Sequence, residues 1–236
     1  MPGCGGLHCY FSFLTLRFTL SAVAYPSIAL AKGGYSGKVC SRKFVTTCPV
    51  WYLINMAQPE PFLRPDQFWT DRELRANQTV IHLGCGPGFF LLPAARVVGP
   101  HGHIIGVDIR EDMLREVEGQ ARREGLSDII QTIRSDLEAG PTKAIKSHSA
   151  DWTLLVNILP QADPKKIIRE AKRVTKPGGI IITVEWLLSQ TTIGPPVANR
   201  ITRSEILSII DELKLKLYKT FSPSPYHYGL LIKVEN

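Results

Sequence analysis

The chain has 236 residues, of which 44% are hydrophobic and 21% are charged. This composition fits one globular domain with a sizeable core and excludes a disordered or fibrous protein. The net charge of +7 is unevenly spread: residues 1–58 carry five basic and no acidic residues, and residues 59–236 carry the other 23 basic and all 21 acidic residues. The folded part is therefore nearly neutral, and we expect a nucleic-acid partner to be unlikely.

Residues 1–58 form a predicted N-terminal extension, poorly ordered or removable, ahead of a single predicted folded domain over residues 59–236. Its apolar run over residues 18–28, preceded by Arg17, is typical of a signal peptide, and its lack of acidic residues is equally typical of a transit peptide. The run is too short for a stable membrane span. A slightly favoured third interpretation is that the functional protein starts at Met56 and is cytoplasmic.

The most informative segment is residues 80–90, where a strand-like apolar run ends in Gly84-Cys85-Gly86-Pro87-Gly88 and a helix-like apolar run follows. A strand, tight turn and helix allow a ligand to touch the backbone, because glycine permits positive φ angles and close approach, and the helix start attracts an anion. A dinucleotide motif, Gly-x-Gly-x-x-Gly, would need glycine at Phe89. The observed spacing therefore disfavours a nicotinamide-dependent dehydrogenase.

Strands and helices are expected to alternate from there on. A second predicted strand ends at Asp108, where an α/β nucleotide site places a carboxylate on the ribose hydroxyls. Asp163-Pro164 and the segment Thr202 to Glu205 are typical helix starts. The expected strands cover residues 103–107, 129–134, 151–156 and 180–185, and the expected helices cover residues 89–98, 111–124, a segment from 163 and a segment from 202 to 213.

The chain ends in two predicted strands, near residues 214–221 and 228–235. The connection between them is too short for a crossover helix, so the last strand must run antiparallel to its neighbour. The alternation before them demands a parallel sheet with helices on both faces. We therefore predict an α/β, three-layer, Rossmann-like fold with a mostly parallel seven-stranded sheet and an antiparallel last strand.

These features resemble the class I S-adenosylmethionine-dependent methyltransferases, and within them the ubiquinone/menaquinone C-methyltransferase-like and other small-molecule methyltransferases. The resemblance covers roughly residues 62–236 and rests on the glycine turn, Val-Asp at Asp108, Ser-Asp-Leu at 135–137 and Lys-Pro-Gly-Gly at 176–179. It implies S-adenosyl-L-methionine as the cofactor. The cofactor-binding residues that it implies are His82, Gly84, Cys85, Gly86, Gly88, Asp108, Ile109, Asp136, Leu137 and Asn157.

Two positions depart from the family pattern. His82 stands where an acidic residue usually helps to hold the methionine amino end, so cofactor binding should weaken if His82 becomes protonated. A histidine that hydrogen-bonds the backbone is the favoured alternative there. The segment from Asn157 to Pro160 lacks the second proline and the aromatic residue of enzymes that methylate the exocyclic amines of bases. Base amino groups are therefore disfavoured as acceptors.

The sequence predicts neither a metal site nor arsenic chemistry. His101 and His103 belong to the opposite end of the sheet from Asp108. Arsenite methyltransferases, a similar group, hold the metalloid with thiols, whereas no cysteine follows Cys85 in this chain. The acceptor and the oligomeric state stay open.

The implied reaction is an in-line transfer of the sulfonium methyl group to a small-molecule acceptor. A non-catalytic cofactor-binding or scaffold protein on the same fold is the alternative. Because ligands bind beyond the carboxyl ends of the strands, Asn157, residues 185–186 and the loop 222–228 should face the acceptor. His227, with Tyr226 beside it, is the candidate general base. Aromatic packing at the start of the last strand is an equally favoured role for this pair.

Overall fold

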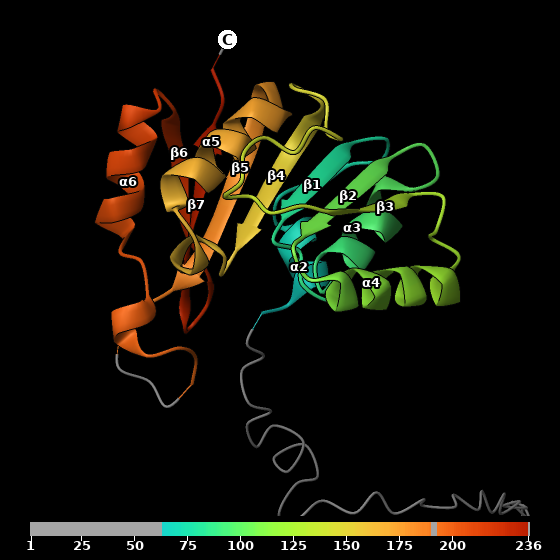
Figure 1. Cartoon of the computed structure of the whole chain (residues 1–236), viewed down its shortest axis with the longest axis horizontal. Helices are drawn as coiled ribbons and strands as arrows, with labels where there is room; N and C mark the ends of the chain where they lie inside the picture. The colour runs from blue at the N-terminus through green and yellow to red at the C-terminus, as the bar shows by residue number, and fades with distance from the viewer. Residues whose placement is uncertain (1–62, 190–192, 236) are drawn as a thin grey trace, which may run out of the picture. The chain divides into compact units, whose positions relative to one another are not determined.

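The computed structural model describes residues 63–189 and 193–235 (Figure 1). The predicted extension over residues 1–58 and the proposed start at Met56 lie outside this part of the chain. Among the described residues, no helix combines the length and the apolar character needed to cross a membrane.

The core of the described chain is one seven-stranded sheet with the strand order β3-β2-β1-β4-β5-β7-β6 (Figure 1). Neighbouring strands from β3 to β5 pair in parallel, and β7 is antiparallel to both β5 and β6. The predicted fold class is confirmed, with its antiparallel last strand. The strands are β1 Thr79–Leu83, β2 His103–Asp108, β3 Ile130–Arg134, β4 Ala150–Val156, β5 Thr175–Trp186, β6 Lys216–Ser224 and β7 His227–Lys233.

Helices cover both faces of the sheet and form two apolar cores with it. One core contains Trp69, Leu91 and Val117, from α2, α3 and α4, and the other contains residues of α5 and α6. Successive side chains of β1 alternate between them, with Val80 in the first core and Ile81 in the second. The helices are α2 Pro65–Thr70, α3 Leu91–Val98, α4 Glu111–Glu124, α5 Pro164–Val174 and α6 Arg203–Glu212.

The predicted starts of α5 and α6 are confirmed by their capping hydrogen bonds. The Asp163 side chain accepts from the backbone N–H groups of Lys165 and Lys166. Thr202 and Glu205 form a reciprocal capping box. Caps of this kind each stabilise a helix by about 1 kcal/mol, so these residues fix where the two helices begin.

Two features differ from the predicted elements. The sequence patterns do not predict α2, whose Trp69 indole donates to the carbonyl oxygen of Phe90 at 2.9 Å and ties this helix to the start of α3. Residues 176–179, predicted as a turn ahead of a strand, belong to an irregular start of β5. The pairing with β4 passes from Ala150–Thr175 directly to Trp152–Ile180, so these residues bulge out of an otherwise regular strand.

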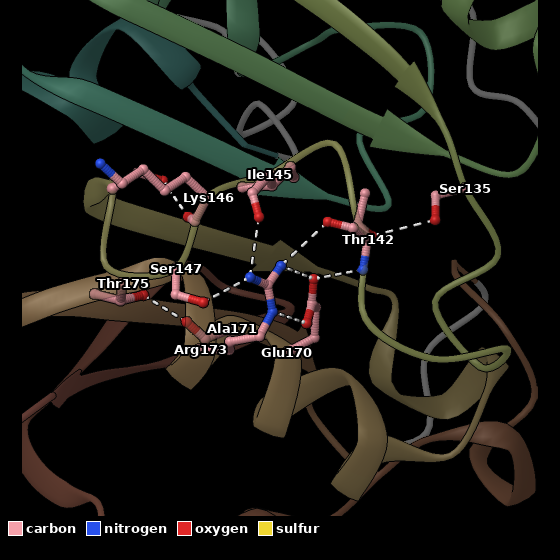
Figure 2. Close-up of polar contacts among 10 residues, drawn as sticks. Ser135, Thr142, Ile145, Lys146, Ser147, Glu170, Ala171, Arg173 and Thr175 are labelled. Carbon is pink, nitrogen blue, oxygen red and sulfur yellow. Dashed lines mark hydrogen bonds and ion pairs between the residues drawn. The ribbon is translucent and has the colours of Figure 1, made fainter.

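The connection between β3 and β4 is anchored by an ion pair on α5, which Figure 2 shows. The Arg173 guanidinium donates twice to the Glu170 carboxylate, at 2.7 Å each, and also to the carbonyl oxygens of Ile145 at 2.9 Å and Thr142 at 3.2 Å. Glu170, only 5% exposed, also accepts from the Thr142 N–H at 3.0 Å. The Ser135 hydroxyl lies 3.2 Å from the Thr142 hydroxyl, so the network reaches the first residue of the Ser-Asp-Leu segment.

We expect Arg173→Met to lower the free energy of unfolding by about 3 kcal/mol, because it leaves the Glu170 carboxylate buried and unpaired. This is the lower end for a broken buried pair, since the Arg173 side chain is 25% exposed. Urea denaturation measures the change. Arg169→Met, on the exposed side of the same helix, is the matched control, and equal stabilities of the two variants would contradict the anchoring role.

Candidate active site

A cavity of about 590 Å³ lies at the carboxyl ends of β1, β2 and β4. The strand order reverses at β1, which is where open α/β sheets bind their ligands. Gly88, the one predicted cofactor residue outside the wall of this cavity, belongs to the turn that precedes α3. The predicted residues within the wall are His82, Gly84, Cys85, Gly86, Asp108, Ile109, Asp136, Leu137 and Asn157.

The glycine turn is fastened to the end of β2. The N–H groups of Gly84 and Cys85 both donate to the carbonyl oxygen of Val107, at 2.8 and 2.9 Å. The N–H of Gly86 donates to Oδ2 of Asp108 at 2.8 Å. The turn is therefore held in place before any ligand binds, and Asp108 joins the second strand to the backbone that a ligand would touch.

The three glycines of the turn all have positive φ angles but serve different purposes. A Cβ atom at Gly84 would lie 2.7 Å from the Ile158 side chain, and one at Gly88 would lie 2.9 Å from the Val117 side chain. Both glycines therefore permit close packing. A Cβ atom at Gly86 would meet no atom within 4 Å, so this backbone faces the open cavity and leaves room for a ligand.

The far wall combines carboxylates with apolar surface. Oδ1 of Asp108 accepts from the Arg110 N–H at 2.9 Å, and Oδ1 of Asp136 accepts from the Glu138 N–H at 2.9 Å. A carboxylate has about four lone-pair positions, so each can accept further hydrogen bonds from a ligand. Ile109 is 55% exposed beside Asp108. An apolar side chain exposed beside carboxylates suits a planar ring that carries hydroxyl and amino groups, such as an adenosine.

His82 lies at the end of β1 in the same wall. Neither of its ring nitrogens has a hydrogen-bond partner among the described residues, although the side chain is buried. The structure thus does not show the backbone hydrogen bond of the alternative interpretation. Burial lowers the pKa of His82 to about 3, so the ring is neutral near pH 7 and one nitrogen can accept a hydrogen bond from an ammonium group.

A second cavity, of about 670 Å³, adjoins the first. Asn157, Gln161 and Ala162 belong to the walls of both. Asn157 has a φ angle of 53°, and its carbonyl oxygen accepts from the Gln161 side chain at 2.5 Å. The end of β4 thus separates the two cavities, and the remaining wall of the second comes from the end of β5 and the segment that leads into α6.

Arg200 organises the segment that covers the second cavity. Its guanidinium donates to the carbonyl oxygens of Ser189, at 2.9 Å, and of Pro195, at 2.8 and 2.9 Å. Gly194 packs so closely on the Trp186 ring that a Cβ atom there would lie 2.5 Å from it. Because Trp186 and Arg200 both belong to the cavity wall, these contacts give the wall a defined shape.

The predicted catalytic pair lies close to Asn157 but outside the walls of both cavities. His227 is fully buried, with Nδ1 at 2.8 Å from the Ser224 hydroxyl and Nε2 at 3.5 Å from Nδ2 of Asn157. Its ring centre lies 4.3 Å from that of Trp186. Burial, helped by the charge of Arg200, lowers the pKa of His227 to about 4. Tyr226 is half-buried beside it.

The sequence does not predict some residues of the first cavity's wall. Phe89, which is 56% exposed, and Met113 belong to its wall. Phe89 directly follows the glycine turn, so its position next to a binding motif is the signal that the sequence offers, whereas nothing in the sequence marks Met113. Among the described residues, no group of three or more histidine, cysteine or acidic side chains is placed to hold a metal ion.

Comparisons with known proteins identify the family. A family model described as a methyltransferase domain matches residues 74–210. The chain belongs to this methyltransferase family and has the class I fold of S-adenosylmethionine-dependent methyltransferases. The resemblance predicted from the sequence and its cofactor are thereby confirmed.

Two curated relatives show the range of similarity. The chain is 28% identical over 114 residues to the ubiquinone/menaquinone biosynthesis C-methyltransferase UbiE of Hahella chejuensis, a match that covers 48% of this chain and 45% of the relative. It is 31% identical over 125 residues to an uncharacterized 37.1 kDa protein in transposon TN4556 of Streptomyces fradiae. This match covers 52% of this chain and 34% of that protein. The match thus spans less than half of each relative.

Solved structures share the fold. A SAM-dependent methyltransferase from Aquifex aeolicus gives a TM-score of 0.67 at 21% identity, covering 73% of this chain and 90% of that chain. Geranyl diphosphate C-methyltransferase from Streptomyces coelicolor A3(2) gives a TM-score of 0.57 at 15% identity. That match covers 72% of this chain and 78% of that chain. The cyclase SpnF gives a TM-score of 0.59 at 17% identity, and the match covers 72% of this chain and 80% of that chain. At these identities the likeness concerns the fold alone.

We expect Gly86→Ala to lower affinity for S-adenosylhomocysteine at least about tenfold, or roughly 1.4 kcal/mol, because its methyl group would enter the open cavity. Gly125→Ala is the matched control. Gly125 has a similar positive φ angle, 69° against 51°, and equally free surroundings, but it ends α4 away from the cavity. Both variants should lose about 1–2 kcal/mol of stability. Calorimetry that finds equal affinity in the two would contradict the assignment.

Because His82 is neutral, we expect the affinity for S-adenosylhomocysteine to be nearly independent of pH. A binding histidine with an ordinary pKa near 6.5 would weaken the cofactor about tenfold by roughly pH 5.5. Because burial lowers the pKa of His82 to about 3, S-adenosylhomocysteine affinity should change less than about twofold between pH 8 and pH 5.5. His82→Gln, whose amide does not titrate, supplies the baseline in calorimetry. A tenfold loss in the parent protein alone would show that His82 does titrate in this range.

Proposed function

We propose that this protein transfers the methyl group of S-adenosyl-L-methionine to a small-molecule acceptor. The observation that carries the proposal is that the cofactor-sized cavity shares the wall residues Asn157, Gln161 and Ala162 with a second cavity of about 670 Å³. Ligand cavities of roughly 300–1,000 Å³ suit drug-sized molecules. The near-neutral charge of residues 59–236 argues against a nucleic-acid acceptor. A cytoplasmic location, where the cofactor is made, fits this proposal.

The residues of the first cavity fit the cofactor. Gly86 leaves room for it, Asp108 and Asp136 have carboxylate positions for hydroxyl and amino groups, and neutral His82 can accept from the ammonium group. When bound, the cofactor supplies an activated methyl group on a sulfonium. The protein must then mainly align the acceptor and exclude water, and alignment of this kind is worth about 7–11 kcal/mol. Asn157, in the walls of both cavities, is placed to do so.

The sequence proposes His227, with Tyr226 as its neighbour, as a candidate general base. The contact of His227 with Asn157 supports a place near the acceptor. Its full burial favours an effect that passes through the Asn157 side chain, because the imidazole lies outside the cavity walls. The His227→Ala variant described below tests both roles.

The alternative, a cofactor-binding protein without methyl transfer, is kept because fold does not determine reaction. SpnF, which shares the fold, is called a cyclase. The second cavity favours transfer, since it offers an acceptor a site beside the cofactor. A direct measurement separates the two proposals.

We expect the protein to bind S-adenosylhomocysteine but not NAD in calorimetry. Asp108→Ala should weaken binding by roughly tenfold to a hundredfold, since charge-assisted hydrogen bonds are worth about 1.5–3 kcal/mol. Asp112→Ala, which removes an exposed carboxylate that pairs only with Arg110 in the described chain, is the control. Incubation with methyl-labelled cofactor and a metabolite extract should label a small molecule. Binding without any labelled product would favour the non-catalytic alternative.

A further inference from the structure

Two buried oxygen atoms of the second cavity's residues lack a partner. Oε2 of Glu185 and Oδ1 of Asn157 have no hydrogen-bond partner among the described residues, and both residues belong to the wall of that cavity. Glu185 has no measurable exposure. Native proteins leave few buried polar atoms unpaired, and each such atom calls for an explanation. Two of them at one cavity point to a ligand that supplies the missing hydrogen bonds.

The parallel pairing of β4 with β5 brings the backbones of the two residues to the same edge of the sheet. Val156 pairs with Val184, and the Asn157 N–H donates to the Val184 carbonyl oxygen at 2.9 Å. Asn157 directly follows β4, and Glu185 is the next residue on β5; neighbouring strands of a sheet lie about 4.8 Å apart. Since Asn157 also belongs to the first cavity, this pair stands where an acceptor must approach the cofactor.

The other oxygen of Glu185 is already bonded. Oε1 accepts from the Leu159 N–H at 3.1 Å, which fixes the carboxyl group and leaves Oε2 as the atom available to a ligand. Burial raises the pKa of Glu185 to about 8. A carboxylate with such a pKa is a stronger base than an exposed one and is suited to take up a proton near neutral pH.

The neighbouring charged and titratable groups have other bonds. Tyr228, opposite Glu185 on β7, donates its hydroxyl to the carbonyl oxygen of Ile201 at 2.9 Å. Arg200 is bonded to backbone carbonyl oxygens, and Glu205 belongs to the capping box of α6. Within the described chain, Glu185 is therefore the acidic group of this cavity wall that is left to meet a ligand.

We propose that Asn157 and Glu185 bind the reacting N–H or O–H group of the acceptor and that Glu185 receives its proton, so the acceptor is an amine or a hydroxyl compound. This inference rests on the proposed methyl transfer. The acceptor nitrogen or oxygen forms a bond to the methyl carbon, the carbon–sulfur bond breaks with its electron pair staying on sulfur, and the proton moves to Oε2 of Glu185. An acceptor that reacts through carbon would not need this pair.

The first test identifies the atom that receives the methyl group. The full-length protein is incubated with ¹³C-methyl S-adenosylmethionine and a metabolite extract, and the carbon shift of the product distinguishes methyl groups on nitrogen, oxygen, carbon and sulfur. We expect a methyl group on nitrogen or oxygen. A methyl group on carbon or sulfur would overturn this inference and leave the proposed function intact, whereas the absence of any product contradicts the proposed function itself.

The second test measures the turnover of variants, with the extract fraction that forms product in the first test as the source of the acceptor. Glu185→Gln keeps the shape of the side chain but cannot take up a proton, so turnover should fall by about 10²-fold or more. The increase in turnover toward pH 8 that we expect of the parent protein should be absent in this variant. S-adenosylhomocysteine affinity should stay within about threefold, under 1 kcal/mol. Glu212→Gln, an exposed acid on α6, is the control. Unchanged turnover and pH profile in Glu185→Gln would overturn the role of Glu185.

His227→Ala separates the two candidate bases in the same assay. If Glu185 takes the proton, His227→Ala should keep the pH profile of the parent protein and mainly raise the Michaelis constant, because it disturbs Asn157. Loss of the pH profile in His227→Ala, with Glu185→Gln unaffected, would return the role of base to His227 and overturn the present assignment.

A binding measurement needs no turnover and covers the case of a poorly folded variant. The parent protein, loaded with S-adenosylhomocysteine, is titrated with phenol and with toluene, which differ in one hydroxyl group, and binding is followed by NMR. We expect phenol to bind at least about tenfold more tightly than toluene, since a site with unpaired polar groups discriminates against a ligand that cannot bond them. The absence of a preference for phenol would overturn the proposal.

Discussion

The hydrogen bond from the Gly86 N–H to the Asp108 carboxylate, 2.8 Å long, is the constraint on which the site depends. It joins the turn after β1 to the end of β2, and the bonds of Gly84 and Cys85 to Val107 reinforce it. Asp108 thereby has two tasks, since one oxygen orders the glycine backbone while the carboxylate still has lone pairs for a ligand. A turn fixed before binding loses little conformational freedom when the ligand arrives.

The same logic extends along the carboxyl edge of the sheet. Parallel strands bring Gly84, Asp108, Asn157 and Glu185 to one edge although they are far apart in sequence. Gly84, Asp108 and Asn157 lie at or just beyond the last paired residue of their strands, and Glu185 is the residue before the last one of β5. At Asn157 this departure requires a φ angle of 53°, which asparagine tolerates better than most residues. The strained residue stands between the two cavities, and strain of this kind concentrates at functional sites.

The sequence predicts the alternation of strands and helices, the antiparallel last strand and the cofactor-binding side, because these follow from local rules, namely glycine spacing, hydrophobic periodicity and a short final hairpin. It also selects the end of β5 as acceptor-facing. It does not predict the unpaired oxygen of Glu185 or the burial of His227, because these depend on which distant segments cover them. The sequence does not predict the anchoring of the β3–β4 connection by Arg173 for the same reason, since the partners Thr142 and Ile145 lie about 30 residues earlier in the chain.

The buried titratable groups differ in what they cost the fold at neutral pH. His82 and His227 have pKa values lowered to about 3 and about 4. The unfolded chain binds their protons more readily, so stability falls only as pH drops below about 6.5. Glu185, whose pKa is raised to about 8, acts in the opposite sense, because the unfolded chain releases its proton from about pH 4.5 upward and stability falls as pH rises toward 8. At pH 7 Glu185 is thus the one of these three groups that opposes folding, and the proposed role at the acceptor site gives this cost a function.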